Sequence, residues 1–396
     1  MNKGIRIARL FDINIKIDWS WLLILLLIVW NLTSAFSQAH PEWGMLFSIS
    51  MGLLAAILFF LSVLLHELAH SLVAKSQGIP VSDITLFLFG GVSNIREEPK
   101  SPGSEFAMAV MGPVTSLVIG FLLLVLSGIG VRVENLRDLQ IMQFLEELGA
   151  LRTIMVWIGS VNVILGVFNL VPGFPLDGGR VLRSIIWRIT GNLRRATQWA
   201  SYIGQAIAWM MIMTGMAMIF GIRIPFFGQG LIDGVWLILI GWFLNNAAIQ
   251  SYQQLVVRDI LGNVPVKQMT KQNPPTVPAE ITVETLIEDY IMQSDDHAFP
   301  VIRAGELVGI VCLDDVRRLP VEERASKTVS DIMTPRSKLV TVSPDDPASK
   351  ALEEISNRSI RQLIVLENNE LYGVIRRRDI VRFLQLQSEE RIKSDN

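Results

Sequence analysis

Six long apolar runs occupy the first two thirds of this 396-residue chain and constrain its fold more than any other feature. A transmembrane helix needs about 20 mostly apolar residues to cross the hydrocarbon core of a bilayer. These runs predict a polytopic α-helical membrane protein with about six transmembrane helices over residues 1–256, followed by a soluble α/β domain over residues 257–396. The runs cover roughly residues 18–36, 50–75, 105–128, 151–171 (continuing irregularly to about 189), 199–220 and 231–252.

Lysine and arginine residues are distributed unequally between the two sides of these predicted spans. They are frequent before the first span, between the second and third spans, and between the fourth and fifth. The other loops hold few, among them Arg132 and Arg137 between the third and fourth spans. Because cytoplasmic loops of membrane proteins carry an excess of basic residues, the N-terminus and the C-terminal domain are predicted to be cytoplasmic.

The net charge and the cysteine content exclude some partners and bonds. The formal net charge is only −2, so a polyanion such as DNA or another nucleic acid is not an expected partner. Cys312 is the only cysteine, so the chain cannot form an internal disulfide.

Two histidines and a glutamate interrupt the second apolar run in the segment LSVLLHELAH, residues 61–70. Ionisable groups inside a membrane span are costly and indicate a functional site by default. His66 and His70 are about one helical turn apart, so both imidazoles lie on one face and can bind one tetrahedral metal ion. Glu67 lies beside that face, where it can act as general base on a metal-bound water. The alternative is a chance match in which the histidines only form hydrogen bonds in the core.

A catalytic zinc ion usually has three protein ligands and one water, so a third ligand is required. The segment NLVPGFPLDGGR, residues 169–180, interrupts the fourth span with prolines and glycines that cannot sustain a regular helix. Irregular backbone at membrane depth persists only where protein or water satisfies its polar groups. Asp177 is therefore predicted to be the third ligand, and the alternative is an interfacial turn capped by this aspartate. His40 and His297 are poor candidates because they lie outside the predicted spans.

The HExxH motif in the second span, with Asn-x-x-Pro and Leu-Asp-Gly in a later span, resembles the site-2 protease family of intramembrane zinc metalloproteases. The resemblance extends over the whole predicted membrane domain. It implies that His66, His70 and Asp177 bind one Zn²⁺ ion per chain. It also implies that Glu67 activates water and that Asn169 helps to position the substrate or to stabilise the oxyanion.

One position departs from the pattern of that family. The segment GPVTS, residues 112–116, has Ser116 where the family often has asparagine. This difference weakens any role expected for the side chain and leaves the predicted zinc site intact.

The segment DITLFLFGGVSNI, residues 83–95, follows the metal-binding helix and is too short to span the membrane. Its β-branched and aromatic residues and its Gly-Gly turn predict a small hairpin near the active site. A strand edge there would align an extended substrate through backbone hydrogen bonds. The alternative is a membrane anchor at the interface.

The C-terminal domain contains an internal repeat: LVGIVCLDDVRRL resembles LYGVIRRRDIVRFL, and Asp315 and Asp379 are 64 residues apart. Each unit has the pattern strand, helix, strand, strand, helix. This pattern resembles a tandem pair of cystathionine-β-synthase-type (CBS) domains. The predicted boundaries are 257–322 for the first repeat and 323–396 for the second repeat with its polar tail.

CBS pairs often bind adenine nucleotides, and the resemblance implies that Asp315 and Asp379 contact the ribose. Cys312 and Arg376, however, occupy the positions at which the nucleotide motif has serine or threonine. A nucleotide sensor that modulates the membrane domain and a purely structural module that forms a homodimer are both consistent with this sequence.

These features favour an intramembrane zinc metalloprotease that hydrolyses peptide bonds in or near the transmembrane segments of membrane proteins. The resemblance implies a transmembrane protein substrate, such as an anti-sigma factor or a signal-peptide remnant. A CBS-regulated transporter or channel is one alternative, in which the intramembrane charges would line an ion path. The spans show no evident internal repeat, which argues against it. An inactive scaffold that retains the fold is the other alternative, although the motifs are intact.

Overall fold

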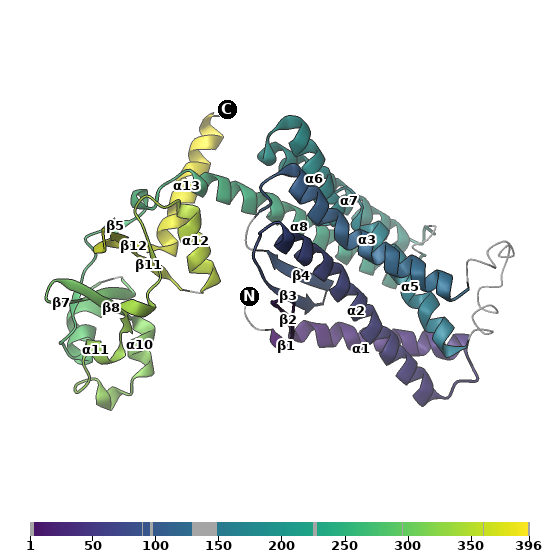
Figure 1. Ribbon diagram of the computed structural model, residues 1–396, viewed down its shortest axis with the longest axis horizontal. Helices are drawn as coiled ribbons and strands as arrows, with labels where there is room; N and C mark the ends of the chain where they lie inside the picture. The colour runs from purple at the N-terminus through teal and green to yellow at the C-terminus, as the bar shows by residue number, and fades with distance from the viewer. Residues whose placement is uncertain are drawn as a thin grey trace. The chain divides into compact units, whose positions relative to one another are not determined.

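The computed structural model describes residues 4–88, 90–95, 98–128, 149–224, 228–294, 296–358 and 360–394. The loop between the third and fourth spans, with Arg132 and Arg137, lies outside the described residues. The chain divides into two compact units, residues 1–253 and 254–396. The first unit is mostly helical, and the second combines short strands with short helices (Figure 1).

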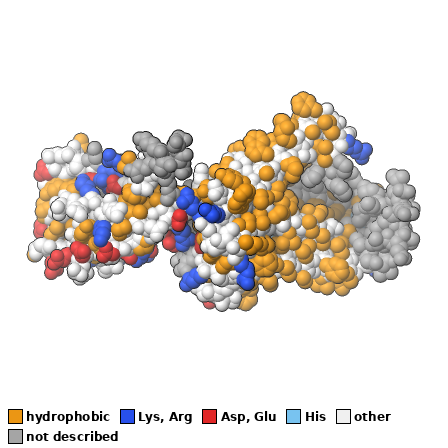
Figure 2. All heavy atoms as spheres, turned by 90° about the horizontal axis from the view of Figure 1, so that it is seen from above, with side chains coloured by type: hydrophobic (Ala, Val, Ile, Leu, Met, Phe, Trp, Pro, Cys, Tyr) orange, Lys and Arg blue, Asp and Glu red, His pale blue; other side chains and the backbone are white. Residues whose placement is uncertain are grey.

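Six helices in the described part of the chain are long and apolar enough to cross a membrane. Large apolar side chains such as Trp30, Phe121 and Ile232 are mostly exposed on them, and hydrophobic side chains cover much of the visible helical surface in Figure 2. The prediction of a polytopic helical membrane protein is confirmed. The helices are α1 (Trp19–Ala39), α2 (Met45–Ser76), α3 (Pro102–Leu126), α5 (Ala150–Asn169), α7 (Leu193–Ile219) and α8 (Leu231–Gly262).

The fourth span ends earlier than predicted. Helix α5 stops at Asn169, and after a loop a separate short helix, α6 (Asp177–Thr190), begins. The loop lies against α7, because Phe174 N donates to Ala200 O at 3.2 Å and Phe174 is buried. The predicted irregular continuation to residue 189 is therefore a loop followed by a regular helix that starts at Asp177.

A sheet of four strands in the described chain packs on α2 and α3 through the buried residues Ile15, Leu68, Ile84 and Met108 (Figure 1). The antiparallel pairing of β3 with β4 confirms the predicted hairpin, and β2 pairs parallel to β3. The two N-terminal strands were not predicted. In the order β1-β2-β3-β4 the strands are β1 (Ile5–Leu10), β2 (Ile13–Ile17), β3 (Val81–Phe87) and β4 (Gly90–Ile95).

The end of α2 determines where this sheet begins. Gly78 has a φ of +78°, and its N–H donates to Lys75 O at 3.0 Å. Ile79 N donates to Ala74 O at 3.0 Å, and the Ile79 side chain is buried. These two hydrogen bonds are those of a Schellman motif, in which glycine adopts the left-handed conformation at no steric cost. The chain therefore leaves α2 sharply and returns along β3 and β4 beside the HExxH residues.

The second unit contains two sheets of four strands each among the described residues, in the orders β6-β7-β8-β9 and β10-β11-β12-β5. Strands β7 and β8 are offset by 64 residues from β11 and β12, as the sequence repeat predicts. Each sheet takes one edge strand from the other repeat: β5 pairs with β12, and β9 pairs with β8. The strands are β5 (Lys271–Gln272), β6 (Val277–Pro278), β7 (Ala298–Arg303), β8 (Glu306–Cys312), β9 (Thr334–Pro335), β10 (Thr341–Val342), β11 (Gln362–Glu367) and β12 (Glu370–Arg376).

The helices of this unit cover the sheets and complete two cores. One surrounds Phe299, and the other surrounds Leu363 and also contains Leu261 and Val266 of the first repeat. The turns between the paired strands use Ala304–Gly305 and Asn368–Asn369, all with positive φ, as is typical of tight hairpins. The α/β fold predicted for the CBS pair is confirmed. The longer helical segments are α9 (Val283–Thr285) with η4 (Leu286–Ile291), α10 (Leu313–Arg318), α11 (Val329–Ile332), α12 (Ala348–Asn357) and α13 (Arg377–Ser394).

Candidate metal centre

Three side chains from two helices converge inside the membrane unit. His66 and His70 lie on α2, and Asp177 is the first residue of α6. Asp177 Oδ2 is 3.1 Å from the Nε2 atom of each histidine, and the two Nε2 atoms are 3.2 Å apart. Both histidines are 4% exposed. In the described part of the chain these residues form a group whose ligand atoms could hold one metal ion.

The outer nitrogen of each imidazole has its own partner. His70 Nδ1 lies 2.7 Å from Met108 O, and His66 Nδ1 lies 2.9 Å from Ser116 Oγ. Because a carbonyl oxygen only accepts, Nδ1 of His70 carries the proton and leaves the Nε2 lone pair facing the cluster. The Ser116 hydroxyl can accept the Nδ1 proton of His66 in the same way. Ser116 therefore contacts a predicted ligand, although its difference from the family pattern weakens the prediction of a role for this side chain.

The space beside the cluster depends on Gly112 of α3. A Cβ atom added there would lie 2.6 Å from His66 Nε2 and closer still to His70 Nε2. A larger residue would therefore occupy the volume that an ion needs. Two imidazole nitrogens and one carboxylate oxygen are a common donor set for a catalytic zinc ion with one open position. The residues present fit Zn²⁺.

Helix α6 is held so that Asp177 faces the histidines. Cβ atoms added at Gly178 and Gly179 would collide with the backbone of the preceding loop, so the helix start packs closely on that loop. Deeper in the helix, Arg183 forms a buried ion pair with Glu105 of α3, and Arg183 Nε lies 2.6 Å from Glu105 Oε1. This pair attaches α6 to α3, the helix that also carries Ser116 and Met108.

Glu67 lies next to the cluster on α2 and is half-buried. Its Oε2 atom accepts a hydrogen bond of 2.7 Å from Ser93 Oγ of β4, and Ser93 Oγ accepts one of 3.1 Å from Ser71 Oγ. A Cβ atom added at Gly91 would lie 2.5 Å from Glu67 Cγ. The glutamate is therefore enclosed between α2 and β4. The sequence predicts a hairpin near the site but carries no signal that marks Ser93, Ser71 or Gly91.

Asn169, predicted to contact the substrate, is the last residue of α5. Its amide nitrogen donates to Leu165 O of the same helix at 3.0 Å. Asn169 therefore stands immediately before the loop that leads to Asp177, and its side chain bonds the backbone of its own helix.

The predicted ribose contact of the first CBS repeat lines a cavity of about 420 Å³. Asp315 Oδ2 accepts from Cys312 N at 2.9 Å, which caps α10. Arg318, Lys338 and Arg361 also line this cavity. Burial raises the pKa of the Cys312 thiol to about 12, so the free thiol stays protonated at neutral pH.

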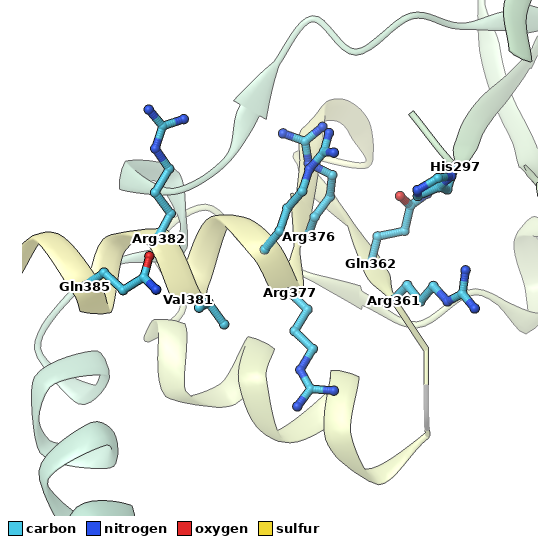
Figure 3. Close-up of a pocket in the computed structure, with 9 residues that line it drawn as sticks. His297, Arg361, Gln362, Arg376, Arg377, Val381, Arg382 and Gln385 are labelled. Carbon is cyan, nitrogen blue, oxygen red and sulfur yellow. The ribbon is translucent and has the colours of Figure 1, made fainter. Parts of the chain in front are cut away.

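Asp379, the predicted ribose contact of the second repeat, is already bonded to an arginine side chain. Arg376 donates to both carboxylate oxygens of Asp379, through Nε at 2.7 Å and a terminal nitrogen at 2.9 Å. Arg376 also pairs with Asp296 at 2.6 Å. The adjacent cavity of about 480 Å³ is lined by several arginines. Figure 3 shows Arg377 and Arg382 on α13, Arg376 just before it and Arg361 beside Gln362, with side chains that extend in different directions. The two repeats therefore offer different chemistry to a ligand.

Comparisons with known proteins match the membrane unit and the second unit to two different families. Residues 54–211 match the model of peptidase family M50, and residues 257–322 and 329–386 match that of the CBS domain. A Synechocystis sp. protein described as a candidate zinc metalloprotease is 34% identical over 97% of this chain and 96% of its own length. A Mycobacterium tuberculosis protein described in the same way is 31% identical over 98% and 94%. The solved site-2 protease from Methanocaldococcus jannaschii is 28% identical, covers 63% of this chain and 95% of its own, and has a TM-score of 0.41.

Proposed function

The chain belongs to peptidase family M50, the site-2 protease family, and we propose that it hydrolyses peptide bonds in or near the transmembrane segments of membrane proteins. It is a multi-pass membrane protein with a CBS pair. The observation that carries the proposal is the convergence of His66, His70 and Asp177 next to the carboxylate of Glu67, with the histidines inside the apolar helix α2 and Asp177 at the start of α6. The Synechocystis and Mycobacterium relatives are described as zinc metalloproteases, which favours the protease over a transporter.

His66, His70 and Asp177 would hold one Zn²⁺ ion through two imidazole nitrogens and a carboxylate oxygen. Zinc, when bound, polarises a carbonyl group and makes water a stronger nucleophile at neutral pH. Met108 and Ser116 keep the Nε2 lone pairs of the histidines directed at the ion. Ser93 holds Oε2 of Glu67, so Oε1 is the atom that accepts the proton of the attacking water and returns it to the leaving amine.

The test is cleavage of a transmembrane peptide by purified protein. Glu67→Gln keeps the size of the side chain but removes its ability to accept a proton. We expect zinc content and folding to be retained and cleavage to fall by at least about a hundredfold. Turnover unchanged in Glu67→Gln would show that another group is the base. A wild-type protein that binds zinc but cleaves no transmembrane peptide would favour the inactive scaffold.

Topology and partners are part of the same proposal. The basic loops support a cytoplasmic N-terminus and cytoplasmic CBS domains, and the CBS pair is proposed to form a homodimer. The substrate is proposed to be a transmembrane protein such as an anti-sigma factor or a signal-peptide remnant. Comparing membrane proteomes of cells with wild-type protein and with Glu67→Gln would identify it, because uncleaved substrate accumulates with the variant.

The CBS pair is proposed to modulate the protease by binding an adenine nucleotide in the cavity of the first repeat. Asp315 has a carboxylate oxygen that does not cap α10, and Lys338 and Arg361 could contact phosphates. Asp379 is a weaker candidate than the sequence suggested, because Arg376 engages both of its oxygens. One nucleotide per chain is the resulting expectation. A ligand can alter activity only through different affinities for the more and less active forms.

A further inference from the structure

We propose that Ser93 of strand β4 is a positioning residue for Glu67, and that it links the binding of an extended substrate on β4 to the orientation of the general base. This inference rests on the proposed function. It concerns a side chain that touches neither the predicted metal ligands nor, by itself, the reacting atoms.

The hydroxyl of Ser93 has a defined direction. A serine hydroxyl has one proton to donate and rotates to suit its surroundings. Ser71 of α2 is fully buried and donates to Ser93 Oγ at 3.1 Å, while Ser93 donates to Glu67 Oε2 at 2.7 Å. Ser71 supplies the proton that Ser93 accepts, so the Ser93 proton is left for Glu67, whose Oε2 is nearer to Ser93 Oγ (2.7 Å) than its backbone oxygen (3.4 Å). The resulting chain of hydrogen bonds fixes one carboxylate oxygen and leaves Oε1 for the attacking water.

Glu67 also contacts the backbone of strand β4 directly. Gly91 and Ser93 are two residues apart, so they face the same side of β4. With no Cβ at Gly91, the Glu67 side chain packs directly on the strand, and Oε1 is 3.4 Å from the position that a Cβ would take. Val92, which points the other way, is exposed. One face of β4 is therefore shaped around the general base.

Strand β4 lies at the edge of its sheet. In the described chain it pairs with β3 on one side and with no strand on the other. An edge strand presents unpaired backbone groups to which an extended peptide can add. When a substrate segment pairs there, β4 becomes an inner strand and its position is fixed from both sides. Ser93 would then hold Glu67 most firmly when an extended substrate is present.

The experiment compares kcat, KM and zinc content of purified full-length variants on a transmembrane peptide. Ser93→Ala should lower kcat roughly ten- to a hundredfold, the effect of losing a hydrogen bond to a charged group, with zinc content unchanged. Ser93→Thr keeps a hydroxyl and should recover most of the loss. Ser71→Ala should lower kcat less, by about threefold, because Ser93 keeps its own proton. Ser62→Ala, a buried hydroxyl of α2 bonded to Phe59 O, is the matched control and should behave like wild type.

A second measurement does not depend on turnover. Infrared difference spectra between wild type and Glu67→Gln isolate the carboxylate bands of Glu67, which should shift in Ser93→Ala and not in Ser62→Ala. Unshifted bands, or an unchanged kcat in Ser93→Ala, would overturn the inference. Equal losses in Ser93→Ala and Ser93→Thr, or loss of zinc from Ser93→Ala, would also overturn it by showing a packing role. A wild-type protein without peptidase activity would contradict the proposed function alone, because the infrared test still decides the role of Ser93.

Discussion

Removing one partner of the buried Glu105–Arg183 pair should destabilise the membrane unit and weaken its metal centre together. Glu105 is fully buried and Arg183 is 7% exposed. Among the described residues Arg180 is a second cation near Glu105, with its Nε 3.9 Å from Glu105 Oε1. The guanidinium of Arg183 also lies over the ring of Phe174, 5.4 Å from its centroid.

The expected magnitude follows from these contacts. An unpaired buried charge costs roughly 3–5 kcal/mol, and Arg180 can compensate for only part of the loss at its greater distance. Loss of the cation–π contact adds about 0.5–1 kcal/mol. Arg183→Met should therefore lower the free energy of unfolding by about 3–4 kcal/mol. Because the pair fixes the helix that begins with Asp177, zinc affinity should fall by roughly ten- to a hundredfold, as it does when groups that support metal ligands are removed.

The assay is a double-mutant cycle with Arg183→Met, Glu105→Leu and the combined variant. Unfolding is followed in a denaturing detergent titration, and zinc affinity is measured by competition with a chromogenic chelator. Replacing a buried ion pair by two apolar side chains is often neutral. Because Arg180 loses Glu105 and Glu98 loses Arg183 as a neighbour at 3.9 Å, the combined variant should be less stable than wild type but more stable than either single variant. Single variants as stable as wild type, or a combined variant as unstable as the sum of the two, would refute the reasoning.

Three further predictions concern the sites themselves. Asp177→Asn should reduce bound zinc at least about tenfold by elemental analysis, whereas Asp233→Asn, in the first turn of α8, should not; full retention in both would assign the third ligand elsewhere. Ser116→Ala should weaken zinc binding roughly tenfold, and Thr115→Ala, whose hydroxyl bonds Met111 O of its own helix, serves as its control; equal affinities would contradict the role of Ser116. Titration with ATP, ADP and AMP should give about one site per chain by calorimetry and change the rate of peptide cleavage, and Asp315→Ala should abolish both; no binding at millimolar nucleotide would make the CBS pair structural.

The sequence by itself determined the features that depend on composition and on local spacing. Apolar runs of sufficient length specify membrane helices because burial in lipid depends on the residues of one segment. His66 and His70 fall on one helix face because helical geometry places residues i and i+4 together. The 64-residue repeat predicted that the paired strands of the second unit recur at a fixed offset, and β7 and β11 have that offset, because the same local pattern occurs twice. Asp177 followed from its unusual position in a broken span.

Only the tertiary structure decided which side chains from distant segments contact the predicted metal ligands and Glu67. Ser93, Ser116 and Gly112 are small residues whose contacts no local spacing predicts, and each acquires its role only by packing against α2. The strands β1 and β2 were missed because a pair of short strands has little stability until β3 and α2 cover it. The exchange of edge strands between the CBS repeats could not be predicted either, since β5 and β9 have only two residues each. Such short strands carry no periodic signal, and their pairing is fixed by the cores that form around them.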